Sequence, residues 1–315
     1  MSSPQPAPET PHCRVCHSTR IAKHFWPQTE FNGRFYTYYR CANCGSLSMF
    51  PMPDDAALAI MYGHLYDAGG LPTQPVDPAT VTFNLYDHQR IALRFFRQAI
   101  GRFPLKGRML DYGCGNGFYM VEAYKAGLQP EGVEFNADVA RRVTARTGLT
   151  VEDVDSFWAR LPHLKPEERY DILHLSHLLE HVDDPLGLMQ QLLAAVKPGG
   201  WVIVDGPVEN NGNLARYTVD FISRLQGRAV NHGLEPMHVT FTTARGQQAF
   251  FRQLGLQQQA FGLAEQAYPL PKPSMLNWRS PRSVVTVGLA QLSLSLSKLV
   301  PGWGNVFHYV GRNTH

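Results

Sequence analysis

Residues 110–117 have the sequence L-D-Y-G-C-G-N-G, which is the strongest indication of the architecture of this chain. The stretch ends a short apolar run that predicts a strand, and a helical pattern follows it from about Gly117 to Ala126. Glycines at alternate positions allow a tight turn and a close approach of backbone to ligand, and the following helix presents N–H groups there. The spacing G-x-G-x-G differs from the G-x-G-x-x-G of dinucleotide-binding folds. We therefore expect a strand–loop–helix unit that binds a ligand through its backbone.

The sequence on both sides of this loop alternates between strand and helix patterns. Residues 108–205 predict five strands, in the segments RMLDYG, PEGVEF, LTVED, YDILHLS and WVIVDGP. Helices are predicted between them, and one begins at Asp184 and Pro185, a pair typical of an N-cap and a first helical turn. Alternation at this spacing predicts a parallel, doubly wound sheet. After Asn210 the pattern is less regular.

This part of the sequence resembles the class I S-adenosylmethionine (SAM)-dependent methyltransferases. The resemblance covers residues 108–210, where LDYGCGNG, DILHLSHLLEHVDDP and LKPGGWVIV are similar to the motifs of the first, fourth and fifth strands of that family. It implies an α/β, Rossmann-like fold with a doubly wound, mostly parallel seven-stranded sheet. It also implies S-adenosyl-L-methionine as the cofactor.

The resemblance assigns cofactor contacts to particular residues. The methionine end of the cofactor is expected at Gly113, Gly115 and Gly117, and Asp111 lies two positions before this loop. Glu134 ends the second strand, where a carboxylate can accept hydrogen bonds from both ribose hydroxyls. Asp153 falls where the family places an acid against the adenine amino group, although Glu152 and Asp155 fit that role equally well by spacing.

Four of the five cysteines form two C-x-x-C pairs, Cys13 with Cys16 and Cys41 with Cys44. The first twelve residues lack the apolar and basic segments of a signal peptide, so we expect a cytoplasmic protein in which such pairs bind metal. Four thiolates suit a closed, structural Zn²⁺ site. Cys13 to His17 also matches the C-x-x-C-H pattern of haem attachment, but haem would leave the second pair unexplained. A redox role for the cysteines stays open.

Residues 38–67, YYRCANCGSLSMFPMPDDAALAIMYGHLYD, extend the resemblance toward the N-terminus. They are similar to the zinc-ribbon portion of a methyltransferase subfamily that includes sugar C-methyltransferases and whose core resembles the quinone-type O-methyltransferases. The resemblance then runs from residue 13 to about residue 262. It implies a small N-terminal zinc-ribbon module and an acceptor that is a small molecule or a carrier-linked sugar or lipid precursor.

Three histidines are candidates for the catalytic base. A hydroxyl or carbon acid must lose a proton to accept a methyl group, and histidine suits that task near neutral pH. His238 lies in LEPMHVTFT, which resembles the subfamily segment where a histidine faces the substrate, and we prefer it to His181. His177 lies closest to the end of the fourth strand. For each of the three a purely structural role stays open.

The segment from His177 to His181 also matches the H-x-x-E-H pattern of one class of zinc protease. Its position, directly after a strand that opens onto the substrate side of a methyltransferase sheet, argues against that activity.

Length and charge limit the classes of function. The chain has 315 residues, roughly twice the length of an average domain of about 150. Its formal net charge is +3, and only 17% of its residues are charged, with no run of like charges. Nucleic acid is therefore an improbable partner, because an electrostatic footprint needs clustered cations.

We expect five segments along the chain. These are a disordered tail (1–11), the zinc ribbon (12–53), a helical connecting arm (54–105), the SAM-binding core (106–262) and a C-terminal extension (263–315). The extension contains an uncharged amphipathic helix over 284–299, with a stripe of leucines at 289, 292, 296 and 299, and a final strand. We expect this helix to cover the sheet or the substrate pocket. A weak contact with a membrane surface and a dimer interface are the alternatives.

The sequence thus predicts a SAM-dependent methyltransferase that acts on a small-molecule or carrier-linked acceptor with help from a histidine. One alternative is an rRNA or tRNA methyltransferase that uses the ribbon to bind RNA. Another is a regulator that binds SAM or zinc without catalysis.

Overall fold

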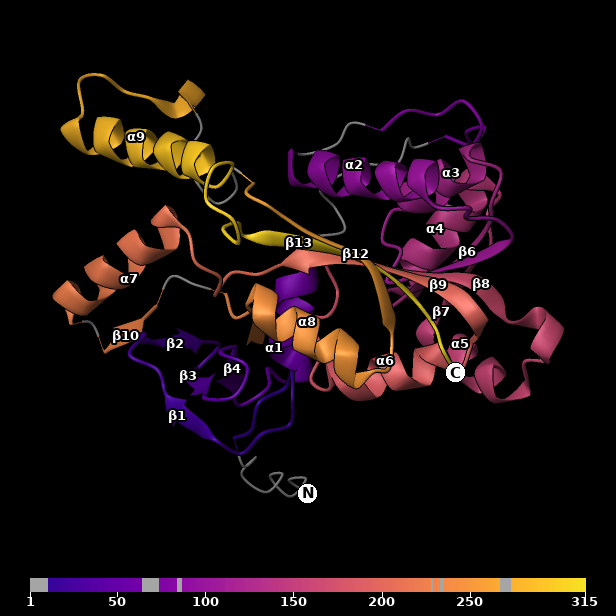
Figure 1. Cartoon of the computed structure of the whole chain (residues 1–315), viewed down its shortest axis with the longest axis horizontal. Helices are drawn as coiled ribbons and strands as arrows, with labels where there is room; N and C mark the ends of the chain where they lie inside the picture. The colour runs from indigo at the N-terminus through magenta and orange to yellow at the C-terminus, as the bar shows by residue number, and fades with distance from the viewer. Residues whose placement is uncertain (1–10, 64–73, 84–86, 228, 233–234, 267–272) are drawn as a thin grey trace.

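The computed structural model describes residues 11–63, 74–83, 87–227, 229–232, 235–266 and 273–315 (Figure 1). The predicted disordered tail, 1–11, lies almost wholly outside the described residues. None of the described helices is both long enough and apolar enough to cross a bilayer.

A seven-stranded sheet forms the centre of the molecule, with the order β12-β13-β9-β8-β5-β6-β7. Only β13 runs antiparallel to its neighbours, so the sheet is mostly parallel, as predicted. The central strands are apolar and buried, because helices cover both faces of the sheet. The bounds of its strands are β5 (Arg108–Tyr112), β6 (Gln129–Glu134), β7 (Val151–Asp153), β8 (Tyr170–Ser176), β9 (Val196–Pro207), β12 (Gln257–Ala264) and β13 (Val306–Arg312).

Helices lie on both faces of this sheet (Figure 1). One face carries α2 (Asp87–Arg102), α3 (Phe118–Lys125) and α4 (Ala137–Thr147); the other carries α5 (Val154–Arg160), α6 (Pro185–Leu193) and α8 (Ala244–Gln253). The first turn of α6 is capped as predicted, since Asp184 Oδ1 accepts a hydrogen bond from Gly187 N at 3.0 Å.

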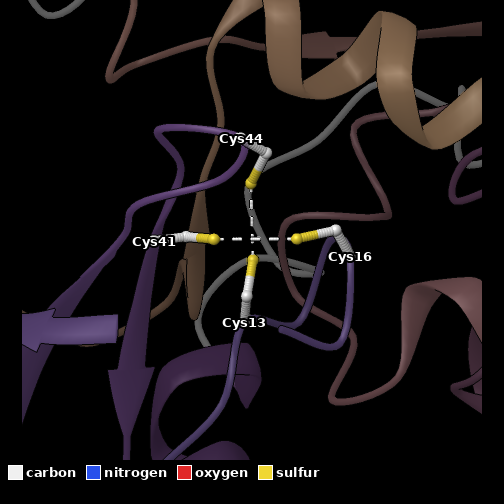
Figure 2. Close-up of side chains that lie close together, drawn as sticks. All are labelled: Cys13, Cys16, Cys41 and Cys44. Atoms are coloured by element: carbon white, nitrogen blue, oxygen red, sulfur yellow. Dashed lines mark hydrogen bonds between the residues drawn. The ribbon is translucent and has the colours of Figure 1, made fainter. Parts of the chain in front are cut away.

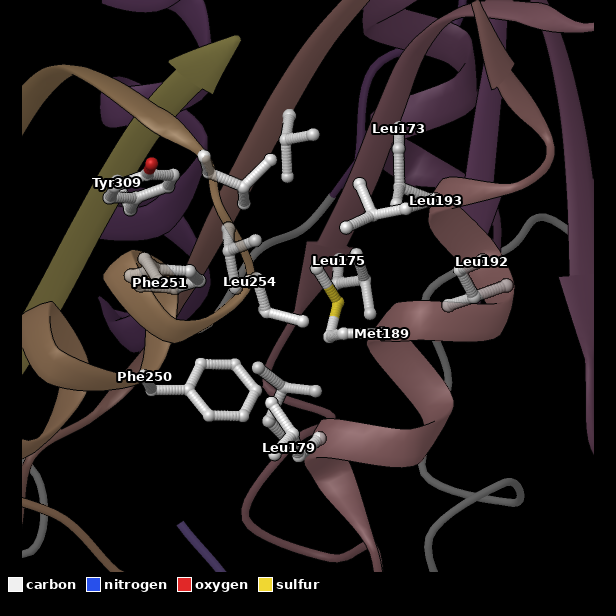
Figure 3. Packing of buried hydrophobic residues seen from close by; sticks show 14 of the residues in the cluster. Leu173, Leu175, Leu179, Met189, Leu192, Leu193, Phe250, Phe251, Leu254 and Tyr309 are labelled. Carbon is white, nitrogen blue, oxygen red and sulfur yellow. The ribbon is translucent and has the colours of Figure 1, made fainter. Parts of the chain in front are cut away.

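The largest apolar cluster fills the space between the sheet and the helices α6 and α8. Figure 3 shows Leu173 and Leu175 of β8 facing Met189 of α6 and Leu254, which directly follows α8. Phe251 stacks on Tyr309 of β13, with ring centroids 3.8 Å apart. This packing fixes the positions of the strand ends that carry the candidate site.

A second sheet contains the N-terminal cysteine module. Its main path is β10-β2-β3-β4-β11, with β1 paired to β3. Two of its strands come from the segment after β9, because β10 pairs with β2 and β11 pairs with β4. The bounds are β1 (Ile21–Lys23), β2 (Gln28–Phe31), β3 (Arg34–Cys41), β4 (Leu47–Phe50), β10 (Val230–Asn231) and β11 (Thr240–Phe241).

The helix of the C-terminal extension does not lie where we expected. Helix α9 (Pro281–Leu296) packs against α7 (Leu214–Gln226), away from the main sheet, and Ser293 Oγ accepts a hydrogen bond from Ala215 N (Figure 1). The leucine stripe is not its buried side, since Leu292 is 49% and Leu299 77% exposed. Small residues face inward instead, because α7 approaches closely; the buried residues are Val287, Ala290 and Ser293. The remaining helices are α1 (Asp55–Gly63) and the single 3₁₀ turns Leu161–His163, Pro166–Glu168 and Pro273–Met275.

Candidate functional site

The glycine loop joins β5 to α3 and requires glycine for its backbone shape. Gly113, Gly115 and Gly117 have φ values of 80°, 53° and 73°, in the left-handed region that other residues rarely adopt. A Cβ atom at Gly117 would also lie 2.7 Å from Val143 Cγ1 on α4. The turn therefore brings its backbone close to both the sheet and α4, at the carboxyl end of the central strand.

Two buried carboxylates flank this turn. Glu134, at the end of β6, is 2% exposed, and its two oxygens accept hydrogen bonds from Gly115 N (2.8 Å) and Asn136 N (3.0 Å). Asp111 is 1% exposed, and its Oδ1 lies 2.7 Å from His174 Nδ1. Asp111 Oδ2 is buried without a hydrogen-bond partner among the described residues.

Asp153 lies beside Glu134 on the neighbouring strand, in direct register. Its carboxylate caps α5, because Oδ1 accepts a hydrogen bond from Ser156 N and Oδ2 one from Ser156 Oγ, both at 2.9 Å. The hydrogen bond from the Ser156 backbone lowers the pKa of Asp153. Asp153 thus lies next to Glu134, and its carboxylate caps the first turn of α5.

The loop after β8 carries two of the predicted histidines. His177 has a φ of 49°, and its Nδ1 lies 3.5 Å from Glu180 Oε1 while its Nε2 lies 3.8 Å from Asp205 Oδ1. Burial alone would lower the pKa of His177, but these carboxylates raise it. Burial alone would raise the pKa of Glu180, but His177 and His181 lower it to about 2. Glu180 is therefore a buried anion among histidines.

His181 and His238 meet at this loop from distant parts of the chain, with ring centroids 4.8 Å apart. His181 Nδ1 donates a hydrogen bond to Met237 O at 2.8 Å, so its Nε2 carries the lone pair. Burial lowers the pKa of His181. His238 Nδ1 lies 2.9 Å from Glu209 Oε2, and although burial opposes it, this carboxylate raises the pKa of His238 to about 9. Near pH 7 the pair thus contains a neutral ring and a protonated ring.

A narrow cavity that is partly open to solvent lies beside this cluster. His177 and Asp205 form part of its polar wall, and Phe95 of α2 and Phe307 of β13 form part of its apolar wall. Gln266 also lines the cavity, and its buried Oε1 has no hydrogen-bond partner among the described residues.

Several polar residues of this region were not predicted from the sequence. They are His174 on β8, Asp205 at the end of β9, Glu180 and Glu209. A signal was present for the first two, because each is a polar residue within an otherwise apolar strand segment, YDILHLS or WVIVDGP. Such a residue usually has a buried partner.

The four predicted metal ligands lie together in the N-terminal module, and Figure 2 shows their sulfur atoms pointing toward one centre. The Sγ atoms of Cys13 and Cys44 are 3.5 Å apart, those of Cys16 and Cys41 are 3.6 Å apart, and all four lie within 4.8 Å of one another. A tetrahedral zinc with Zn–S bonds of about 2.3 Å requires sulfur separations of about 3.8 Å. The observed separations are close to this value, so the cluster fits a tetrahedral zinc ion. No disulfide links the four cysteines, so all four sulfur atoms are available as ligands.

The module is attached to the loop that carries the histidines. Arg14, between the first two cysteines, is fully buried, and its guanidinium donates hydrogen bonds to Asp183 O (3.0 Å) and Met49 O (3.2 Å). It also forms an ion pair with the Asp183 carboxylate. His17 Nε2 lies 3.1 Å from Asp184 Oδ1. The cysteine module thus supports the end of the loop that begins at His177.

Comparison with known proteins relates this site to one family. A family described as a methyltransferase domain matches residues 86–259, which is more than half of the chain. A ubiquinone biosynthesis O-methyltransferase of Leptothrix cholodnii is 29% identical over 132 residues, covering 41% of this chain and 55% of the relative. The ubiquinone biosynthesis O-methyltransferase of Bordetella avium is 26% identical over 215 residues, covering 64% of this chain and 85% of the relative. The ubiquinone biosynthesis O-methyltransferase of Burkholderia ambifaria is 33% identical over 98 residues, covering 30% of this chain and 42% of the relative. The chain therefore spans about half, or less, of the length of two of these three relatives.

Solved structures with a similar fold include a SAM-dependent methyltransferase from Archaeoglobus fulgidus. Its TM-score is 0.42 at 18% identity, covering 71% of this chain and 94% of that chain. Magnesium protoporphyrin IX methyltransferase from Synechocystis has a TM-score of 0.44 at 12% identity, covering 72% and 84%. Both TM-scores are below 0.5, so no functional conclusion follows from them.

Proposed function

Because the chain belongs to the methyltransferase-domain family, we propose that it transfers a methyl group from SAM to a small-molecule or carrier-linked acceptor. The observation that carries this proposal is the glycine turn at the carboxyl end of β5, with Asp111 and Glu134 on either side. Ligands of open α/β sheets bind at this edge.

The donor set at the turn suits SAM. Asp111 Oδ2 is a buried acceptor that lacks a donor among the described residues, and a ligand ammonium group would supply one. Glu134 stands at the end of the second strand of the core, and a carboxylate can accept several hydrogen bonds at once, which suits a ribose diol. We propose that Asp153 accepts a hydrogen bond from the adenine amino group. Glu152 and Asp155 are the alternative residues for this contact. Bound SAM supplies the electrophilic methyl group, and the chain aligns the acceptor and takes its proton.

His181 is our proposed base. Its neutral ring carries a lone pair on Nε2, held in that tautomer by the bond from Nδ1 to Met237 O. His238 was preferred from the sequence, but the proximity of Glu209 raises its pKa to about 9, which favours a protonated ring at pH 7. We assign His238 the role of stabilising an acceptor oxygen as its negative charge develops. Glu180, whose Oε1 lies 3.5 Å from His177 Nδ1 and 3.7 Å from His181 Nε2, balances the positive charge of this histidine cluster.

The cavity supports an acceptor that is largely apolar and donates hydrogen bonds. Its polar wall includes a carboxylate, Asp205, and an amide oxygen, Gln266 Oε1, while Phe95 and Phe307 offer aromatic faces. The names of the relatives support an oxygen nucleophile on a small molecule.

We further propose that the cysteine cluster holds one structural zinc ion. The sulfur separations of 3.5 and 3.6 Å and the absence of disulfides among these cysteines support it. Zinc-bound thiols are typical of reducing compartments, which supports a cytoplasmic location. An RNA-binding role for the module is disfavoured, because Arg14 is fully buried and Arg34 pairs with Asp54.

Calorimetry with S-adenosylhomocysteine (SAH), the demethylated product, tests the cofactor site. We expect the wild type to bind SAH and Glu134→Ala to weaken binding by about tenfold or more, since two or more charge-assisted hydrogen bonds are lost. Glu122→Ala is the matched control, a carboxylate on α3 that faces Arg97 and Lys125. A wild type without affinity for SAH or SAM would overturn the proposal.

A methylation screen over a metabolite library tests the activity. Release of SAH with any acceptor would exclude a regulator that binds SAM without catalysis. Methylation of RNA would instead support the alternative of an RNA methyltransferase. His181→Gln is expected to lower turnover while leaving SAH affinity unchanged. An equal loss for His238→Gln and none for His181→Gln would restore the sequence-based preference.

A further inference from the structure

A buried histidine lies between two carboxylates on the three central strands of the main sheet. Asp111 is on β5, His174 on β8 and Asp205 on β9. Asp111 Oδ1 lies 2.7 Å from His174 Nδ1, and Asp205 Oδ2 lies 3.8 Å from His174 Nε2. The three side chains are 2%, 0% and 5% exposed, so the cluster is shielded from bulk water.

The surroundings of His174 favour its charged form. Phe96 of α2 and Tyr119 of α3 contact its ring, with centroids 4.7 and 4.6 Å away. Burial raises the pKa of the Tyr119 phenol well above its ordinary value, so this group stays neutral. Burial alone would lower the pKa of His174, but Asp111 and Asp205 raise it to about 9. Two buried carboxylates on one side of a sheet need such a cation between them.

The two carboxylates belong to different parts of the proposed active site. Asp111 lies two positions before the glycine turn, whereas Asp205 lines the cavity next to His177. Ser176 Oγ donates a hydrogen bond to Asp205 Oδ1 at 2.8 Å, which fixes the orientation of that carboxylate. His174 therefore lies against one residue of each site.

We propose that His174 is a positioning residue, a buried cation that holds the carboxylate of the cofactor turn and that of the acceptor cavity, so that the charge of one affects the other. This inference rests on the proposed function, since it takes the turn as the SAM site. Its consequence is that a change at Asp205, in the cavity, alters cofactor affinity through His174. A residue that only fills space between the strands would not transmit such a change.

The charge of His174 can be measured directly. In ¹⁵N-labelled protein, the ring nitrogens of His174 are expected to show the imidazolium signature from pH 6 to pH 8, assigned by their loss in His174→Gln. A neutral ring at pH 7 would overturn the inference. This measurement needs neither SAM nor an acceptor. Where His174→Gln fails to fold, the ring signals are assigned instead through their correlation with the backbone resonances of His174 in the wild type.

Coupling between the sites is tested with Asp205→Asn, with SAH as the probe in calorimetry from pH 6 to pH 8. Removing one carboxylate is expected to lower the pKa of His174 by about two units, since a nearby opposite charge shifts a pKa by about 1–3 units. The affinity of the variant for SAH then changes by several-fold across this range, while that of the wild type stays level. Asp171→Asn, at the other end of β8 and paired with Lys197, is the matched control and should behave as the wild type. Parallel pH profiles for Asp205→Asn and the wild type would refute the coupling. A wild type that binds no SAH at any pH would instead refute the proposed function.

Discussion

Replacing Arg14 by alanine should destabilise the protein, because this side chain joins the cysteine module to the histidine loop. The guanidinium is fully buried, donates to Asp183 O and Met49 O, and lies 4.4 Å from the centroid of the Phe50 ring. Alanine leaves two carbonyls without these donors, each costing about 1–2 kcal/mol, and removes stacking worth about 0.5–1 kcal/mol. The ion pair between Arg14 and Asp183 adds little to the free energy of unfolding, since the Asp183 side chain is 59% exposed.

We therefore expect Arg14→Ala to lower the free energy of unfolding by about 3–4 kcal/mol. Urea denaturation followed by tryptophan fluorescence, with zinc saturating throughout, measures this loss. Arg40→Ala is the matched control, because Arg40 is an exposed arginine of the same module, and it should stay within about 0.5 kcal/mol of the wild type.

The loss of stability in Arg14→Ala should be largest in the histidine loop. Amide hydrogen exchange is expected to accelerate in residues 177–184 of the Arg14→Ala protein, because Asp183 loses its anchor. If Arg14→Ala unfolds at the same urea concentration as Arg40→Ala, or if exchange in that loop is unchanged, the module does not support the loop.

Three further outcomes are expected. Elemental analysis should give about one zinc per chain, and Cys41→Ser should lose the metal and lower the melting temperature; a metal-free protein with unchanged melting would contradict the site. Glu209→Gln should lower the pKa of His238 in an NMR titration. Because the folded pKa of about 9 lies above the ordinary 6.5, the stabilising effect of Glu209 is complete below pH 6.5 and disappears as the pH rises through 9, so equal stability of wild type and variant at pH 6 would contradict the pairing. Gly117→Ala should weaken SAH binding and lower stability more than Gly115→Ala, since a Cβ meets Val143 only at the former; equal melting temperatures would refute the steric argument.

The sequence predicted the main sheet because its strands are local apolar runs bounded by glycine or polar residues. YDILHLS, for example, corresponds to β8 without change. Strand β11 was not predicted because it is only two residues long and exists through its pairing with β4, which has no local pattern in the sequence. Helix α7 was not predicted although local signals were present: its sequence is amphipathic, Asn213 caps its first turn, and Gly227 follows its last residue.

The candidate site was predictable in part. The glycine turn and the cysteine pairs are close in sequence, so their spacing alone indicates their geometry. The pairing of His238 with Glu209, and of His174 with Asp111 and Asp205, depends on which strand ends the fold brings together. Residue identity therefore indicated candidate catalytic and cofactor-binding groups, whereas their pKa values depend on the neighbours that the fold supplies.

The sharing of strands between the N-terminal sheet and the segment after β9 has a consequence for synthesis on the ribosome. The four cysteines of the proposed zinc site emerge early in translation, and the set is complete once residue 44 is released. Strand β4, however, stays an open edge until Thr240 and Phe241 have been made, long after Phe50 at the end of β4. We expect the module to bind metal well before its sheet is closed, so that a chain truncated before residue 240 would bind zinc yet present an exposed strand to its neighbours.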